Sequence, residues 1–175
     1  MSGLDTDQIG KLESLFLEWI QSQEFPAPRG DQPEPSYTGD VVLPRVEEFT
    51  KNLGKDFLVV RGDGGVPPLP LTIDGLQFFP DLEIVSFTDR YIALEVKILR
   101  GGDFTGALTK ALGQALIYRT LGVRDSHVVL IDHRYTSSKI HDPLLGNWLN
   151  SVKGLGIHVH WFSPSFGGTM RCQAL

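Results

Sequence analysis

One strongly apolar segment, from Tyr91 to Leu99, carries two charged side chains in its middle. Side chains alternate across a strand, so the segment predicts one fully apolar face and an opposite face from which Glu95 and Lys97 project together. Burying a carboxylate and an ammonium group costs several kcal/mol each unless they are paired or bind a metal. We therefore interpret the segment as a core strand that carries a functional site. An ion pair at a sheet edge is the alternative.

Length and charge limit the class of protein. The chain has 175 residues, of which 41% are hydrophobic, so we expect one domain with a substantial core and perhaps a small appended element. Sixteen Lys and Arg against twenty-one Asp and Glu give a net charge of -5, so a nucleic-acid partner requires a local basic patch. Cys172 is the one cysteine, which favours a reducing compartment. Without a secretory signal or an apolar run of membrane-spanning length, we expect a cytoplasmic protein with no membrane partner.

Hydrophobic periodicity and turn residues divide the chain into elements. The predicted helices cover 5–23, 44–53, 104–121 and 143–152, and the predicted strands cover 57–60, 91–99, 127–131 and 157–162. Residues 71–85 are expected to form a bent or bulged strand region. Four prolines in 24–38 predict an extended linker without regular structure. We therefore divide the chain into an N-terminal helix with its Pro-rich linker (1–38) and a main domain (39–175).

Two short motifs, one before the predicted strand 91–99 and one within it, carry a family resemblance. Pro80-Asp81 follows one predicted strand region, and Glu95-Val96-Lys97 lies within the next strand, immediately before a long predicted helix. In this order the chain resembles the PD-(D/E)xK nucleases, also called restriction-endonuclease-like. The resemblance implies an α/β fold, with an αβββαβ core whose mixed central sheet is flanked by helices, and an extra N-terminal helix.

The resemblance also assigns roles to these residues. Asp81, Glu95 and the backbone carbonyl of Val96 are the expected metal ligands, while Asp81, Glu95 and Lys97 are the expected catalytic residues. Phosphodiester hydrolysis needs a cation to offset charge on the phosphate, and Mg²⁺ prefers carboxylate and carbonyl oxygens; Mn²⁺ is the expected substitute. Lys97 would orient the attacking water or steady the phosphate.

A further acid often comes from the first core helix in this superfamily. Glu47 and Glu48 are the two acids in the predicted helix 44–53. Val46 and Phe49 already define its apolar stripe, so we favour Glu48 as the additional metal ligand.

A second signature lies on the helix after the Glu-x-Lys strand. Gln114 and Tyr118 are four residues apart and share a helical face with Lys110, one turn earlier. This pair resembles the Gln-x-x-x-Tyr element of the RecB-like and lambda-exonuclease-like branches. It predicts a polar row that positions the substrate. The alternative is an ordinary solvent-exposed helix face.

The histidines give a weaker signal. His127, His133 and His141 lack clean ligand spacing, while His158 and His160 share a strand face and would suit a metal. A packed or exposed terminal strand is the preferred interpretation, so we leave the histidines out of the site.

Together these features predict a Mg²⁺-dependent deoxyribonuclease of restriction, phage defence or DNA processing. An RNA nuclease of the same fold and a catalytically silent nucleic-acid-binding or scaffold subunit are the alternatives. Cleavage of both strands would require two sites, so we expect a homodimer or larger assembly. The N-terminal helix, with Phe16 and Trp19 on its apolar side, is the candidate interface.

Overall fold

The computed structural model describes residues 4–55, 58–62, 64–86, 89–100, 104–133, 143–165 and 168–173. The helices are α1 (Thr6–Ser22), α2 (Glu34–Tyr37), the π-helical turn η1 (Thr38–Val42), α3 (Leu43–Asn52), α4 (Phe104–Thr120) and α5 (Pro143–Lys153). The strands are β1 (Glu24–Pro26), β2 (Val59–Gly62), β3 (Leu71–Ile73), β4 (Leu76–Phe78), β5 (Leu82–Val85), β6 (Arg90–Leu99), β7 (Asp125–Asp132), β8 (Ile157–Pro164) and β9 (Thr169–Cys172).

Seven strands form one mixed, mostly antiparallel sheet in the order β1-β9-β8-β7-β6-β5-β2. The central strands β6, β7 and β8 run parallel to one another, and the remaining pairs are antiparallel. β3 and β4 form a separate hairpin between β2 and β5 in the chain. The strand that carries Glu95 and Lys97 is therefore central, as expected, with neighbours on both sides.

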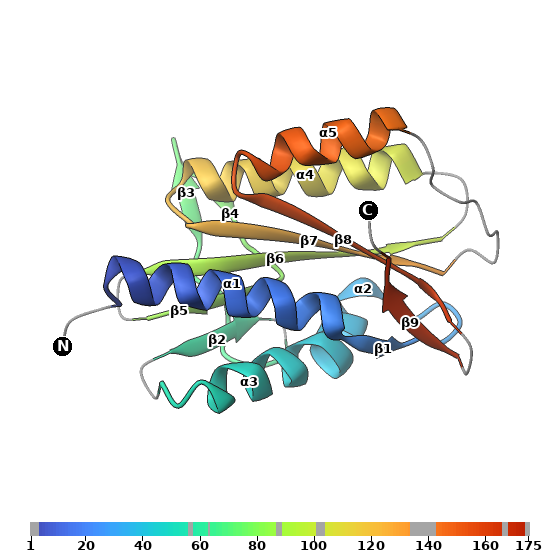
Figure 1. Cartoon of the computed structure of the whole chain (residues 1–175), viewed down its shortest axis with the longest axis horizontal. Coiled ribbons are helices and arrows are strands. Elements are labelled where there is room, and N and C mark those ends of the chain that lie inside the picture. Colours follow the sequence, from blue (N-terminus) through green and yellow to red (C-terminus); the bar gives the residue numbers. More distant parts are fainter. Residues whose placement is uncertain are drawn as a thin grey trace.

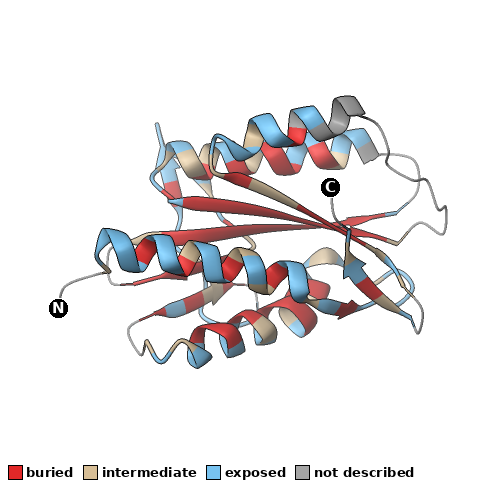
Figure 2. Ribbon diagram, viewed as in Figure 1, coloured by how far each residue is buried: buried red, intermediate tan, exposed pale blue. Residues whose placement is uncertain are grey.

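Helices cover both faces of the sheet (Figure 1). α4 and α5 lie along one face, and α1 and α3 lie along the other. The alternating pattern of β6 fits this arrangement: Leu94 and Val96 belong to the core beneath α1 and α3, whereas Leu99 packs with residues of α4. Burial follows the layers, because the central strands are buried along their length and the helices are buried on the sides that face the sheet (Figure 2).

Local sequence explains where the two long helices begin and end. At the start of α1, Asp5 and Gln8 form a reciprocal capping box, which satisfies backbone N–H groups that have no partner within the helix. Ile9, Leu12 and Phe16 then recur at helical spacing and are buried. α4 is followed by Gly122 at φ 98°, a left-handed conformation that glycine adopts without steric cost.

The proline-rich segment is more ordered than the expected extended linker. It contains β1, which pairs with β9 near the other end of the chain, and the short helix α2. The prolines are compatible with both elements. Pro26 lies in an edge strand, where a missing N–H breaks few ladder hydrogen bonds, and Pro35 lies in the first turn of α2, where N–H groups lack partners anyway.

The N-terminal helix belongs to the main core. Phe16 is fully buried and stacks edge-on against Phe49 of α3, with ring centroids 5.3 Å apart. The surface proposed for self-association therefore lacks Phe16, while Trp19 remains half-buried against both rings. Among the helices that the structure describes, none is long and apolar enough to cross a membrane.

Candidate active site

The candidate site forms where β5 and β6 part. Their pairing ends at Leu82 and Leu94, so the next N–H groups on that edge of β6 have no strand beside them. Two carboxylates take its place: the N–H of Val96 donates to Asp81 Oδ2 at 2.7 Å, and the N–H of Ile98 donates to Glu34 Oε2 at 2.8 Å. The open edge therefore holds two acids by backbone hydrogen bonds, which fix their positions more firmly than solvent contacts would.

Lys97 lies among three carboxylates. Its Nζ is 2.7 Å from Glu95 Oε1, and longer ion pairs reach Glu34 at 3.5 Å and Asp81 at 3.9 Å. The same ammonium group donates to the carbonyl oxygen of Val96 at 3.1 Å. Glu95 and Lys97 are 1% and 7% exposed, so these charges interact in a poorly solvated environment. We call Glu34, Asp81, Glu95, Lys97 and the Val96 carbonyl the carboxylate cluster.

The carboxylate cluster is crowded with negative charge. Burial and the neighbouring Glu95 carboxylate raise the pKa of Asp81 to about 7, although Lys97 and the Val96 N–H oppose the shift. Burial lowers the pKa of Lys97, but Glu95, Asp81 and Glu34 together raise it above its ordinary value. Lys97 therefore stays charged, and the three carboxylates carry more negative charge than one ammonium group neutralises.

Tyr118 of α4 contacts both β6 and the segment that precedes Asp81. Its hydroxyl lies 2.9 Å from Glu95 Oε2 and 3.0 Å from the carbonyl oxygen of Phe79, two residues before Asp81. Gln114 Nε2 lies 3.5 Å from the same hydroxyl, and the buried Gln114 amide oxygen has no hydrogen-bond partner among the residues that the structure describes. Because Tyr118 is 1% exposed, its contacts suit the positioning of Glu95 better than direct contact with a substrate.

The structure brings most of the predicted site residues together. Asp81, Glu95, Lys97 and the Val96 carbonyl meet at one edge, with Gln114 and Tyr118 behind them, while Lys110 is exposed on α4.

The third carboxylate beside Lys97 belongs to neither of the two acids predicted on the first core helix. Glu48 is exposed and lines a pocket between α1 and α3 with Trp19 and Arg45, and no contact with the cluster is found for it among the described residues. The acid beside Lys97 is Glu34, at the start of α2. Sequence reasoning missed Glu34 because the segment around it resembles a linker. The one local signal is the Glu34-Pro35 pair, which suits a first helical turn.

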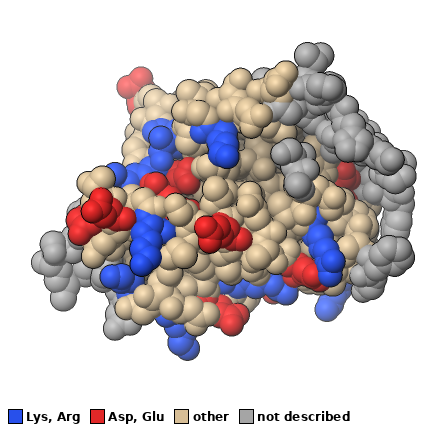
Figure 3. Space-filling view, viewed as in Figure 1, with Lys and Arg blue, Asp and Glu red and all other residues tan. Residues whose placement is uncertain are grey.

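Charge on the surface is mixed. Figure 3 shows basic and acidic side chains interspersed on the face that it presents, with no continuous basic patch among the coloured atoms.

Comparison of the chain with protein-family models gives no match, and neither does comparison with curated protein sequences.

Proposed function

We propose that this chain is a metal-dependent nuclease with a restriction-endonuclease-like core, and that the carboxylate cluster is its catalytic centre. One observation carries the proposal: Glu34, Asp81 and Glu95 converge with Lys97 and a backbone carbonyl on one open strand edge. The order of elements is also compatible with that core, because α3, β2, β5, β6, α4 and β7 follow one another, with only the β3–β4 hairpin inserted.

The ligand chemistry of the cluster fits a hard divalent cation. Carboxylate and carbonyl oxygens are the ligands that Mg²⁺ and Mn²⁺ prefer, and Asp81, Glu95 and the Val96 carbonyl offer them side by side. Burial raises the pKa of Asp81 and the Glu95 carboxylate raises it further, so a cation bound beside Asp81 would offset both effects on the charged carboxylate. When bound, the cation supplies charge stabilisation for the phosphate and a lower pKa for the attacking water.

The chain's own residues supply position and charge. Glu95 is held by Tyr118 from one side and by Lys97 from the other, so its carboxylate has little freedom to rotate. Lys97 keeps its proton and presents a fixed ammonium group that steadies a phosphate oxygen or orients water. Glu34 accepts a hydrogen bond from the Ile98 N–H at the open edge of β6 and adds a further carboxylate beside Lys97.

A substrate panel tests the proposal. Purified protein is incubated with labelled single-stranded DNA, duplex DNA or RNA in Mg²⁺, Mn²⁺ or EDTA. We expect cleavage of DNA with either metal, none in EDTA, and a loss of at least about 100-fold in Asp81→Asn, Glu95→Gln and Lys97→Met. Glu18→Gln, which removes an exposed carboxylate on α1, is the matched control and should cleave at the wild-type rate.

The alternatives appear as outcomes of the same panel. Cleavage of RNA alone would assign the same chemistry to a ribonuclease. If no nucleic acid is cleaved with either metal, the result favours a binding or scaffold subunit. The net charge of -5 is compatible with this alternative, because it repels a polyanionic substrate.

A further inference from the structure

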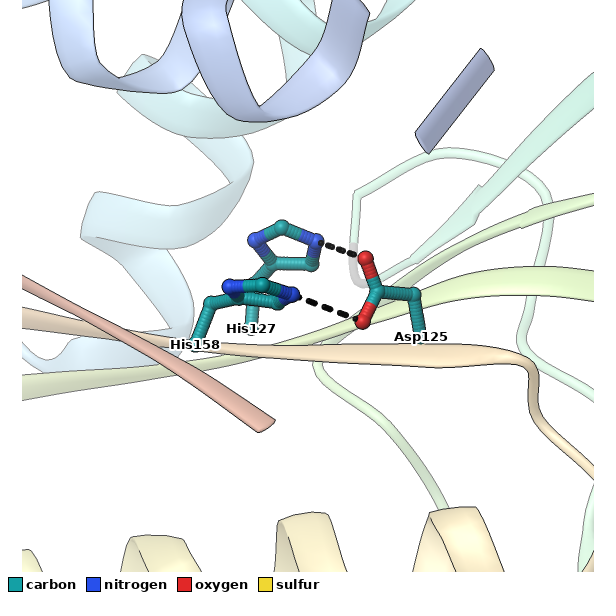
Figure 4. A group of neighbouring side chains, drawn as sticks. All are labelled: Asp125, His127 and His158. Carbon is teal, nitrogen blue, oxygen red and sulfur yellow. Dashed lines mark hydrogen bonds and ion pairs between the residues drawn. The ribbon is translucent and has the colours of Figure 1, made fainter. Parts of the chain in front are cut away.

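A second polar cluster lies on the other face of the sheet. β7 and β8 are parallel neighbours whose register places His127 beside His158, and Asp125 precedes His127 by two residues on the same face. In Figure 4 the three side chains converge and point away from α4. Phe16 of α1 contacts His127 from above, with ring centroids 4.8 Å apart. The cluster therefore lies beneath α1, whereas Glu95 and Lys97 face α4.

The three side chains already hold the distances of a compact ligand set. Asp125 Oδ2 is 3.2 Å from His127 Nε2, and Asp125 Oδ1 is 3.1 Å from His158 Nε2. One ligand atom from each residue lies within 4.8 Å of the others. The two imidazole rings stack with centroids 4.9 Å apart, and the Nε2 atoms of both rings face the Asp125 carboxylate. Small side-chain movements would allow one ion to replace the two hydrogen bonds at metal–ligand distances of about 2.0–2.2 Å.

Burial and hydrogen bonding set the protonation of these side chains in the metal-free chain. Burial lowers the pKa of His127, which keeps this imidazole neutral at physiological pH. Burial tends to raise the pKa of Asp125, but hydrogen bonds from His127 and His158 outweigh it and leave the pKa well below its usual range. Because Nε2 of each histidine donates to the Asp125 carboxylate, binding a cation at Nε2 requires that proton to leave or to move to Nδ1. Nδ1 of His127 lies 2.8 Å from Nε2 of His160, which can accept the relocated N–H.

His160 supplies a partner behind the ligands. Its Nε2 lies 2.8 Å from Nδ1 of His127, and burial holds its pKa well below the usual value, so it too is neutral. Metal-bound histidines commonly use their second ring nitrogen in such a hydrogen bond, which fixes the tautomer and ring orientation. His158, the most exposed of the three ligands, lines a surface pocket of about 370 Å³ and so gives the cluster a route from solvent.

From this geometry we infer that Asp125, His127 and His158 form a second metal site, one that takes a divalent transition metal of the Zn²⁺ class. Two imidazole nitrogens and one carboxylate suit Zn²⁺ or Co²⁺, whereas Mg²⁺ prefers oxygen ligands. The site is independent of the proposed nuclease activity because it uses other side chains on the opposite face of the sheet. Its position between β7, β8 and α1 gives a bound ion a structural role. Glu13 of α1, which is partly buried, places a further carboxyl group near Asp125.

The test measures Zn²⁺ binding by the whole chain, by competition with a chromophoric chelator, in excess Mg²⁺ so that oxygen sites are occupied. We expect one Zn²⁺ per chain in the wild type, and an affinity lower by at least about tenfold in His158→Gln and Asp125→Asn. His133→Gln removes a histidine outside the cluster and should bind as the wild type does. Co²⁺ is the spectroscopic probe, and its visible absorption should report nitrogen ligands in the wild type and in His133→Gln, and weaken in His158→Gln.

Three results would overturn the site. The first is the absence of Zn²⁺ binding to the wild-type chain. The second is equal binding by folded His158→Gln, which would place the ion elsewhere and leave the cluster as a hydrogen-bonded core. The third is loss of binding in Glu95→Gln but not in Asp125→Asn, which would assign the ion to the carboxylate cluster. If Asp125→Asn does not fold, partly exposed His158→Gln and the wild-type Co²⁺ spectrum still decide.

Discussion

Asp81 directly precedes β5 and Asp125 begins β7 of the same sheet, yet their neighbours shift the two pKa values in opposite directions. Both carboxyl groups are partly withdrawn from water, which raises the pKa of each. Asp81 has Glu95 nearby, and its pKa rises further, to about 7. Asp125 accepts hydrogen bonds from two imidazoles, and its pKa falls instead. Neighbouring donors and charges therefore decide whether the charged form of each carboxyl group is disfavoured, as in Asp81, or stabilised, as in Asp125.

This difference suggests two kinds of site. The carboxylate cluster has excess negative charge that its protein contacts leave unneutralised, which is typical of a site that uses a cation for chemistry. The Asp125 cluster satisfies its carboxylate internally and packs under α1, which is typical of a structural role.

A large effect on catalysis is expected from Glu34, the acid that the sequence did not reveal. Glu34→Gln removes a carboxylate beside Lys97 while keeping an oxygen for the Ile98 N–H, so the fold should survive. We expect nuclease activity to fall by about 100-fold, equivalent to about 2.7 kcal/mol of transition-state stabilisation. Single-turnover cleavage assays measure the change.

Glu48→Gln decides between the two candidate acids. Glu48 lies in the pocket between α1 and α3, so this variant should cleave at the wild-type rate. The reverse pattern, with Glu48→Gln inactive and Glu34→Gln fully active, would contradict the assignment of Glu34.

Opposite effects on stability are expected from two matched substitutions. Asp125→Asn removes the charge that accepts from His127 and His158, and should lower the free energy of unfolding by about 2–3 kcal/mol. Asp81→Asn removes a charge that its neighbours disfavour, and should raise this free energy by about 1 kcal/mol in EDTA at pH 8. Urea denaturation of both variants measures the two changes.

The raised pKa of Asp81 explains why Asp81→Asn should increase the free energy of unfolding. The unfolded chain loses this proton near pH 4, but the folded chain keeps it up to about pH 7, so ionisation of Asp81 destabilises the fold as pH rises between these values. The gain from Asp81→Asn should therefore be largest above pH 7 and vanish near pH 4. A gain that is independent of pH, or a stabilising Asp125→Asn, would remove the contrast between the two carboxylates.

A smaller effect is expected from the hydroxyl that joins the cluster. Tyr118→Phe keeps the buried ring but leaves Glu95 and the Phe79 carbonyl without their common partner. We expect a loss of about 1 kcal/mol in stability and about tenfold in turnover, with little change in substrate KM. Lys110→Ala, on the exposed face of α4, should instead raise KM if that side chain contacts the substrate. A KM effect confined to Tyr118→Phe would favour direct substrate contact by Tyr118.

Local patterns in the sequence predicted the elements whose structure depends mainly on local contacts. The helical spacing of α1 and α4 and the alternation along β6 are properties of neighbouring residues, and the structure has these elements within two residues of their expected bounds. Asp81 and Glu95 could be grouped for the same reason, since β5 and β6 are consecutive antiparallel strands and their acids meet at one end.

Long-range packing explains what the sequence did not reveal. β1 exists because Phe25 pairs with Met170 across almost the whole chain, and Glu34 reaches the site because α2 packs beside the open edge of β6. Likewise, His158 meets His127 only through the parallel register of β7 and β8. Proline content and histidine spacing carry no information about these pairings, which tertiary contacts determine.

The dependence of DNA cleavage on Mg²⁺ concentration tests the central claim most directly. Under single-turnover conditions, the wild-type rate should rise from zero in EDTA to a plateau as Mg²⁺ is added, and Glu95→Gln should give no product at any Mg²⁺ concentration. Cleavage that persists in EDTA, or a Glu95→Gln rate equal to that of the wild type, would contradict the assignment of the carboxylate cluster as the catalytic centre.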